Sequence, residues 1–566
     1  MNLQGNRRIV VHLAVLVCLC GLVQVVVVTR ATVAGIDAVR FVGIARQIDA
    51  VGFLQTVRGE GEQPLFPLAL STTHGLLRAV AGESPSLWAT SAQATAAAAL
   101  VLAVVPVYFI ARRLVGPTGG FIAGVFFCVL PEVARLGADG ISDSMHLLFF
   151  ALAFWGVLEY VRGDNRLIMI GAGVSVGLAL MTRVEAIVLL PAIAVALPAC
   201  QFRAETRRTW TKLPDAGGAL ALGLAIVLGP YLIAVGPGGP RDSAAANAVL
   251  RILGRWHPAS SEIETATASA VNWLRPSDDN TAWQTADGRK VAFGVKEPGT
   301  SIRRRGYAAA AWQFVDELAD AFGYAIGALS ILGLVHLWRL GRLRPGPAEL
   351  LVGAFSLLFA LAAIRFTAAE GYLNARHLLL LVVLGIAPAG IATIAITHRL
   401  RSFLNTKGLK TKASWSLAVV VVLLAATCLP VALRPLHAGR AAHRRAGCWL
   451  AGAAEPGVVL DTKGWTDLYS ARTTFQYDQA RETFADRRLA YVVVQHGDLE
   501  SCSDRAQTLH FLLHAAAEPA ASFAGRNENN GVTVYRWHPE RFRRLIDAEQ
   551  TSDSNNTKSL ATKGDT

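Results

Sequence analysis

Long apolar runs alternate with short polar or basic segments along most of this chain. A helix crosses the hydrocarbon core of a bilayer with about 20 apolar residues, and eleven runs approach or reach that length. They span approximately residues 9–29, 88–111, 117–134, 143–161, 167–182, 184–200, 216–236, 322–338, 348–365, 377–397 and 414–433. The pattern therefore predicts a multi-pass α-helical membrane domain over residues 1–433, with about eleven transmembrane helices.

The region after the last run has a different pattern. Strand-like segments rich in β-branched residues cover residues 457–461, 489–495 and 531–537, and helix-like segments separate them. We expect residues 434–548 to form a small α/β domain with an accessory or acceptor-binding role, because no catalytic set is recognisable there. The polar tail at 549–566 is predicted to be disordered.

Composition and charge support a membrane protein and indicate its orientation. Charged residues make up 17% of the 566 residues, the mean hydropathy is +0.39 and the net charge is +13, whereas soluble domains carry about 25% charged residues. The basic clusters fall in alternate short loops, beginning with Arg7–Arg8 and Arg112–Arg113. By the positive-inside rule these loops and the amino terminus are cytoplasmic, so the positive charge requires no nucleic-acid partner.

The opposite, external side then receives the first loop at 30–87, a long loop at 237–321 and the C-terminal domain. Ionisable residues at the ends of several predicted helices lie on the same side, where such residues are functional-site candidates. They are Asp37, which opens an amphipathic helical pattern, and Asp139, Asp143, Arg183, Glu185, Arg365, Arg376 and His377. Carboxylates beside arginines suit a reaction in which an acceptor loses a proton and a phosphate-bearing group departs.

Each candidate also has a purely structural interpretation. Asp37 and Asp143 could cap their helices, and Asp139 could stabilise a glycine-flanked turn. Arg183 and Glu185 could satisfy a tight hairpin, and Arg376 could extend toward the membrane surface. Cys448 and Cys502 are the only cysteines of the C-terminal domain, and a disulfide between them is chemically permitted in an oxidising compartment.

Four segments, in order and on one side, resemble the GT-C integral-membrane glycosyltransferases, in particular the protein O-mannosyltransferase and aminoarabinose-transferase branch. "GIDAVRFVGIARQI" with "QPLFPLALSTTHGLL" is similar to the first external loop of that family, and "ISDSMHLLFFALAF" to its acidic start of the fourth span. "GLALMTRVEAIVLLP" and "NARHLLLLVVLGIAP" resemble two later family segments. The chain departs from the pattern at Ala38, where a second acidic residue is usual, at Gln63, where the family has a basic residue, and at His377, where it has a tyrosine.

The resemblance implies transfer of a sugar from a polyprenyl-phosphate-linked donor to a lipid, glycan or protein acceptor outside the cytoplasm. In this interpretation Asp37 is the general base, Arg376 and Arg183 bind the donor phosphate, and Asp143 and Asp139 form a second acidic site. That site could hold a divalent cation, although no spacing specifies a metal. Supporting roles for acceptor or structure fall to Glu185, His377 and Arg365.

We expect a bacterial plasma membrane location, with the active site and the C-terminal domain extracytoplasmic and with membrane lipids as neighbours. Two other functions fit the same pattern. A multi-pass secondary transporter would also have many spans and embedded charges, but its coupling residues would lie near the middle of the membrane. A degenerate, non-catalytic GT-C-like membrane protein would explain the alanine at position 38.

Overall fold

The computed structural model describes residues 3–60, 62–203, 212–235, 282–284, 290–292, 306–340, 346–407, 413–500 and 504–545. The chain divides into two compact units. Unit 1 comprises Met1–Ala79, Ser91–Trp256 and Arg303–Leu436, and unit 2 comprises Val80–Thr90, His257–Ile302 and His437–Thr566. Most of the long loop predicted at 237–321 and all of the tail at 549–566 lie outside the described residues.

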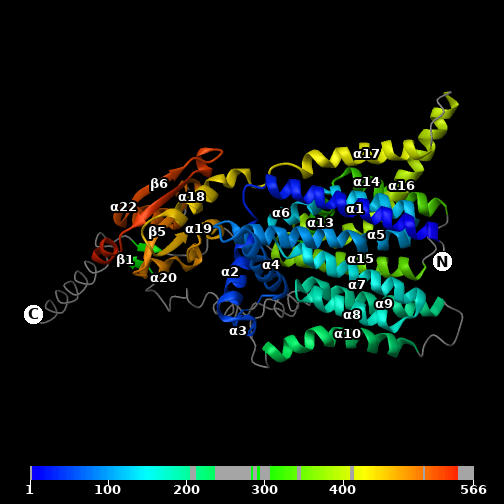
Figure 1. Cartoon of the computed structure of the whole chain (residues 1–566), viewed down its shortest axis with the longest axis horizontal. Helices are drawn as coiled ribbons and strands as arrows, with labels where there is room; N and C mark the ends of the chain where they lie inside the picture. The colour runs from blue at the N-terminus through cyan, green and yellow to red at the C-terminus, as the bar shows by residue number, and fades with distance from the viewer. Residues whose placement is uncertain are drawn as a thin grey trace, which may run out of the picture. The chain divides into compact units, whose positions relative to one another are not determined.

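The described residues of unit 1 form helices joined by short turns and loops, and the long helices run roughly parallel (Figure 1). Every apolar run predicted to span the membrane overlaps one of them. They are α1 (Leu3–Arg30), α5 (Leu87–Val129), α7 (Asp143–Gly163), α8 (Arg166–Leu180), α9 (Leu189–Arg203), α10 (Lys212–Val235), α14 (Ala325–Arg339), α15 (Pro347–Glu370), α16 (Leu379–Thr406) and α17 (Ala413–Ala432).

Among the described residues, seven helices are long and apolar enough to cross a membrane when α5 is counted once. The helix α13 (Tyr307–Ala321) and α14 meet at a 102° bend and would together make an eighth span. The helices α8 and α9 are apolar but shorter. A multi-pass helical membrane protein is therefore confirmed, while the number of eleven spans stays a prediction.

The helix α5 contains two of the predicted spans. It breaks at Gly116, whose φ of +81° lies in the left-handed region that glycine tolerates. A Cβ on Gly120 would lie 2.7 Å from the backbone of Arg112, although residues eight apart in a straight helix are about 12 Å apart. The two arms of α5 therefore fold back on each other.

One predicted boundary is wrong. The run at 117–134 was expected to form a single helix, but the second arm of α5 ends at Val129 and a short helix, α6 (Pro131–Asp139), follows. Leu130 has an extended conformation, as expected of a residue before a proline, and Pro131 begins α6.

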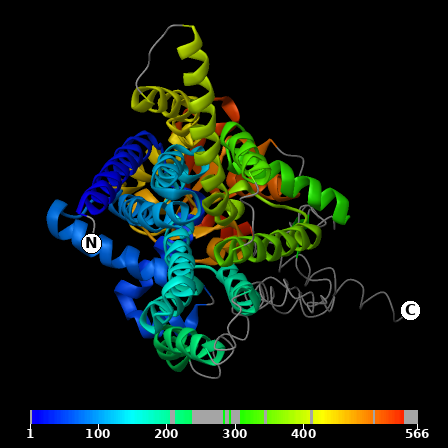
Figure 2. The ribbon, with the colours of Figure 1, turned by 90° about the vertical axis from the view of Figure 1, so that its right-hand side faces the viewer.

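Small residues bring α8 and α10 together. A Cβ on Gly173 of α8 would collide with the carbonyl oxygen of Leu220, and one on Gly223 of α10 would collide with that of Ile170. Figure 2 shows these helices, in cyan and green, lying side by side. Such close backbone approach is the usual packing of membrane helices, in which lipid offers no hydrophobic drive for association.

The segment at 30–87, predicted to be the first external loop, folds into three helices, α2 (Ile36–Val51), α3 (Phe53–Gly59) and α4 (Leu65–Ala81). In Figure 1, α2 runs across the direction of the long helices. Gly35 N–H donates to the carbonyl of Asp139 (2.9 Å), and Leu65 N–H donates to that of Met181 (3.1 Å). These bonds fix the start of α2 to the end of α6, and the start of α4 to the residue that follows α8.

Unit 2 contains a five-stranded sheet of order β4-β3-β5-β7-β6 (Figure 1). The strand β3 is parallel to β4 and β5, and β7 is antiparallel to β5 and β6. The strands are β3 (Val458–Asp461), β4 (Thr474–Gln476), β5 (Leu489–Gln495), β6 (Ala517–Phe523) and β7 (Val532–Trp537). A separate antiparallel pair joins β1 (Ala282–Gln284) and β2 (Lys290–Ala292).

Helices cover both faces of this sheet. Val492 and Val494 of β5 pack with side chains from α20 (Ala480–Ala485) and α22 (Asp504–Ala516). Tyr491 and Val493 point to the other face and pack with α18 (Ala441–Gly452). The expected small α/β region is confirmed, and three of its strands lie where the sequence predicts them. Short helices α19 (Asp467–Ser470) and α21 (His496–Leu499) follow β3 and β5.

Candidate active site

Asp37 lies in the first turn of α2, but it does not cap that helix. The N-cap residue is Gly35, and Asp37 directs its carboxylate to another part of the chain. Arg376 Nη1 donates to Asp37 Oδ2 at 2.7 Å. The neighbouring Ala38 is fully buried, so the side of α2 where the family pattern has its second acidic residue packs into the interior. Asp37 alone supplies the carboxylate of this turn.

Arg376 is held by a short helical turn, η3 (Ala375–Leu378). Asn374 caps this turn, because its side-chain oxygen accepts from Arg376 N–H at 3.3 Å. The side chain of Gln313, on α13, donates to the carbonyl of Leu373 at 3.2 Å. These two bonds fix the loop that presents Arg376 and His377 next to each other.

Arg183 lies in the turn between α8 and the short helix η1 (Val184–Val188), where it joins two carboxylates. Its Nη1 is 2.7 Å from Asp143 Oδ1, and its Nη2 is 2.7 Å from Glu185 Oε1. Burial alone would lower the pKa of Arg183, but the carboxylates of Asp143 and Glu185 raise that pKa overall. One cation therefore faces two anions, and the group as a whole carries an excess negative charge.

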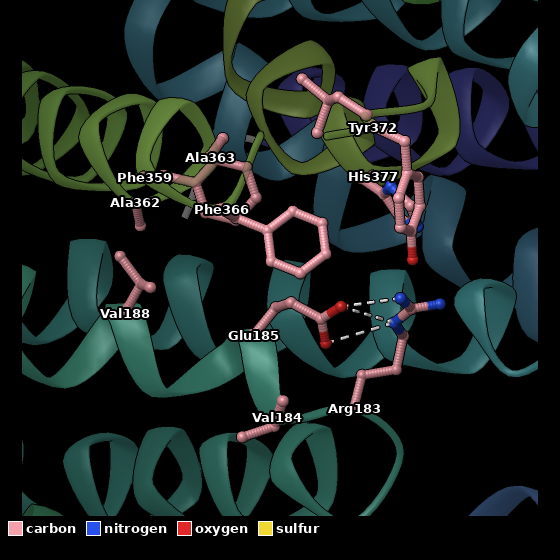
Figure 3. A pocket seen from close by; sticks show the side chains of 11 residues that line it. Arg183, Val184, Glu185, Val188, Phe359, Ala362, Ala363, Phe366, Tyr372 and His377 are labelled. Atoms are coloured by element: carbon pink, nitrogen blue, oxygen red, sulfur yellow. Dashed lines mark hydrogen bonds and ion pairs between the residues drawn. The ribbon is translucent and has the colours of Figure 1, made fainter. Parts of the chain in front are cut away.

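A cavity of about 230 Å³ adjoins this group. Figure 3 shows an apolar wall from α15, with Phe366 pointing toward Glu185, and a polar end where Arg183 and His377 lie. Its lining residues are Arg183, Val184, Glu185, Val188, Phe359, Ala362, Ala363, Phe366, Tyr372, Leu373 and His377. The cavity is thus amphiphilic, with charge at one end and aromatic and aliphatic side chains at the other.

A smaller cleft of about 20 Å³ shares Arg183, Glu185 and His377 with this cavity. Arg376, Asp143 and His146 also line the cleft, so it joins the ion pair of Arg376 to the Arg183 group. The sequence reasoning did not single out His146, a buried residue of α7 whose Nδ1 lies 3.3 Å from the carbonyl of Ala179. Its position three residues after Asp143, on the same side of one helix, was the available signal.

The other sequence candidates lie elsewhere. Asp139 ends α6, and its backbone carbonyl accepts from Gly35. Arg365 lies on α15 but lines neither cavity. Cys448 is exposed, and its predicted partner Cys502 lies outside the described residues, so the disulfide stays a prediction. Within the described part of the chain, no group of three or more His, Cys, Asp or Glu residues could hold a metal ion.

Comparison with known proteins adds to this geometry. Residues 88–232 match the family described as dolichyl-phosphate-mannose-protein mannosyltransferase, and no curated protein sequence is significantly similar. The structure of ArnT from Cupriavidus metallidurans bound to undecaprenyl phosphate is similar at 12% identity, covering 93% of this chain and 97% of that chain, with a TM-score of 0.57. The oligosaccharyltransferase of Archaeoglobus fulgidus in complex with zinc and sulfate is similar at 12% identity, covering 86% of this chain and 68% of that chain, with a TM-score of 0.51. The chain therefore has the fold of the GT-C superfamily of integral-membrane glycosyltransferases.

Proposed function

We propose that this protein is a glycosyltransferase that moves a sugar from a polyprenyl-phosphate-linked donor to an acceptor on the non-cytoplasmic face of the membrane. The observation that carries this proposal is the amphiphilic cavity, whose adjoining cleft is lined by Arg376 of the Asp37–Arg376 ion pair. The donor class is amphiphilic in the same way, with an isoprenoid chain joined to a phosphate and a sugar. The GT-C fold and the family match at 88–232 support the same class.

The cavity wall formed by Phe359, Phe366 and Val188 suits an isoprenoid chain. In the cleft that adjoins the polar end of the cavity, Arg376 can pair with phosphate oxygens, because a guanidinium matches their geometry with two parallel hydrogen bonds. Arg183 is less available to the donor than Arg376, since it already holds two carboxylates.

The reaction needs one base and one group that stabilises the leaving phosphate. Asp37 takes the proton of the acceptor hydroxyl as the acceptor oxygen bonds to the anomeric carbon of the sugar. The bond from that carbon to the phosphate oxygen breaks, and its electron pair leaves with the polyprenyl phosphate. The transition state is oxocarbenium-like, as in glycoside hydrolysis. Arg376 neutralises the charge that develops on the departing phosphate.

The alternatives fit the site less well. A transporter would carry its coupling residues near the membrane midplane, whereas Asp143 begins α7, Arg183 lies in a turn and Arg376 lies in the turn η3. The degenerate interpretation rests on Ala38, but that residue is buried and Asp37 is present beside it.

The proposal is tested by incubating the purified full-length protein with polyprenyl-phosphate sugars and candidate acceptors, followed by mass analysis. We expect one acceptor to gain the mass of the donor sugar, with release of free polyprenyl phosphate. Retention of the sugar on the lipid with every acceptor offered, in a preparation that binds the donor, favours the degenerate interpretation.

A further inference from the structure

Resting on this proposed function, we infer that donor binding switches on the base: the donor phosphate displaces Asp37 from Arg376, and only then can Asp37 accept the acceptor's proton. The two residues assigned to separate steps are bonded to each other at 2.7 Å. Asp37 Oδ2 accepts from Arg376 Nη1, so this oxygen is not available to an acceptor hydroxyl while the hydrogen bond persists. The ion pair therefore holds the base in an inactive form while the donor is absent.

Arg376 is more available than Arg183 to bind an incoming phosphate. Arg183 is already opposed by Asp143 and Glu185, which together exceed its charge. Arg376 is opposed by Asp37, and its Nε is buried with no hydrogen-bond partner among the described residues. The guanidinium of Arg376, which lines the cleft adjoining the cavity, therefore has an Nε–H that can still donate a hydrogen bond.

The Asp37–Arg376 pair is built to be exchangeable. The side chains are 44% and 32% exposed, so water and salt screen their attraction, and pairs of this kind contribute little to stability. A phosphate can engage a guanidinium through two oxygens at once, which makes the stronger pair. Exchange breaks no covalent bond, because one hydrogen-bond acceptor on Arg376 replaces another.

The order of events follows from this competition. If the acceptor arrives before the donor, Asp37 is still paired with Arg376, and the acceptor hydroxyl keeps its proton. A donor that arrives first frees the carboxylate beside the anomeric carbon. The enzyme therefore activates an acceptor only when the donor sugar is present for the acceptor oxygen to attack. When the polyprenyl phosphate leaves as product, Asp37 can pair with Arg376 again.

The competition between Asp37 and the donor phosphate for Arg376 predicts that removal of a catalytic residue increases the affinity for a phosphate lipid. Replacing Asp37 by asparagine abolishes the base but should tighten the binding of a phosphate lipid, because the competing anion is gone. We expect about two- to five-fold tighter binding, the range set by the strength of an exposed ion pair. A residue that only holds the fold, or only contacts the acceptor, gives no such gain.

The experiment measures binding of undecaprenyl phosphate to the detergent-solubilised full chain and its variants. Asp37→Asn should bind more tightly than wild type, Asp37→Glu should bind like wild type, and Arg376→Ala should bind more weakly. Glu62→Gln is the charge-matched control, because Glu62 lies in the same external loop and pairs with Arg40 at 2.6 Å. Its affinity should be unchanged, which separates displacement at Arg376 from a general loss of negative charge.

Equal or weaker binding by Asp37→Asn than by wild type overturns the inference and leaves the proposed function standing if wild type transfers sugar. Equal tightening by Glu62→Gln also overturns it, because the gain would then reflect overall charge. If neither wild type nor any variant binds undecaprenyl phosphate or transfers sugar, the proposed function itself fails, and the inference fails with it.

Discussion

Asp37 and Arg376 are 339 residues apart in the sequence but form one ion pair in the structure. Each could be picked out from the sequence as a charged residue near the end of an apolar run. Their pairing could not, because it depends on how α2 and η3 pack. The same holds for Arg183, which the sequence suggests as a phosphate ligand and which the structure places between Asp143 and Glu185.

Asp37→Asn keeps the size of the side chain and removes the base. We expect sugar transfer to fall by about 10²–10⁴-fold, the usual contribution of general base catalysis. The amount of folded protein in the membrane should be unchanged, since the side chain is partly exposed and does not cap α2. Transfer rates at saturating donor measure the effect, and a rate within a few-fold of wild type would remove Asp37 from the base role.

Arg183→Leu should destabilise the protein, because it leaves two carboxylates without their cation. Breaking a buried ion pair costs about 3–5 kcal/mol, and we expect a value near the lower end because the Arg183 side chain is 21% exposed. The matched control is Arg166→Leu, which breaks the exposed pair with Asp215 and should change stability far less. Thermal unfolding in detergent compares the two, and similar shifts would show that the Arg183 group is not structural.

At the level of helices and strands, local pattern predicts most of what forms. Apolar runs predict the membrane helices, because in lipid the backbone N–H and C=O groups can form hydrogen bonds only with other backbone groups of the protein, as they do in a helix. β-branched segments predict β3, β5 and β7. The edge strands β4 and β6 were missed, because β4 has three residues and β6 reads "AEPAASF", with alanines and a proline that are typical of an edge. The break of the α5 region into two arms and α6 depends on Gly116 and Pro131.

The crossing of α8 and α10 makes a prediction at this level. Gly173→Val should weaken packing between the two helices, because any Cβ at that position meets the backbone of α10. Gly171→Val is the control on the same helix, since a Cβ there has open space. Both replacements carry the same propensity cost, so the difference in thermal stability reports the contact. Equal losses would mean that the close approach contributes nothing.

The docking of α18 on the sheet should depend on pH. His443 of α18 is fully buried, and its Nε2 lies 3.3 Å from Gln495 Oε1 of β5. Burial lowers the pKa of His443 below its ordinary value of 6.5, so the folded state binds a proton less readily than the unfolded state. The contribution of neutral His443 to the stability of the folded state is then fully present above pH 6.5 and is lost as the pH falls toward the lowered pKa.

Hydrogen exchange of the backbone in α18 and β5, followed in the full-length protein across this pH range, measures the effect. Protection should fall on acidification in wild type and change less in His443→Gln, which keeps a polar side chain but cannot titrate. The same acid loss in both proteins would assign the pH dependence to other groups.

At the scale of the whole molecule, the central claim is that a GT-C fold presents its charged site to a lipid-linked donor on the non-cytoplasmic side. The fold is established by its architecture and its structural relatives, and the sidedness rests on the basic loops of the sequence. The family that the sequence segments resemble has the same fold as this chain. The choice of acceptor, in contrast, depends on the shape and chemistry of surfaces, which the hydrophobic pattern does not predict.

The most direct test places the purified protein in sealed vesicles with a radiolabelled polyprenyl-phosphate sugar and acceptors confined to one side. Orientation of the protein is fixed by protease access to the C-terminal unit. The proposal predicts that label moves from lipid to acceptor on the side of the C-terminal unit, and that Asp37→Asn and Arg376→Ala abolish this movement. Label that stays on the lipid, reaches acceptors only on the opposite side, or crosses the membrane without a change of chemical linkage would contradict it.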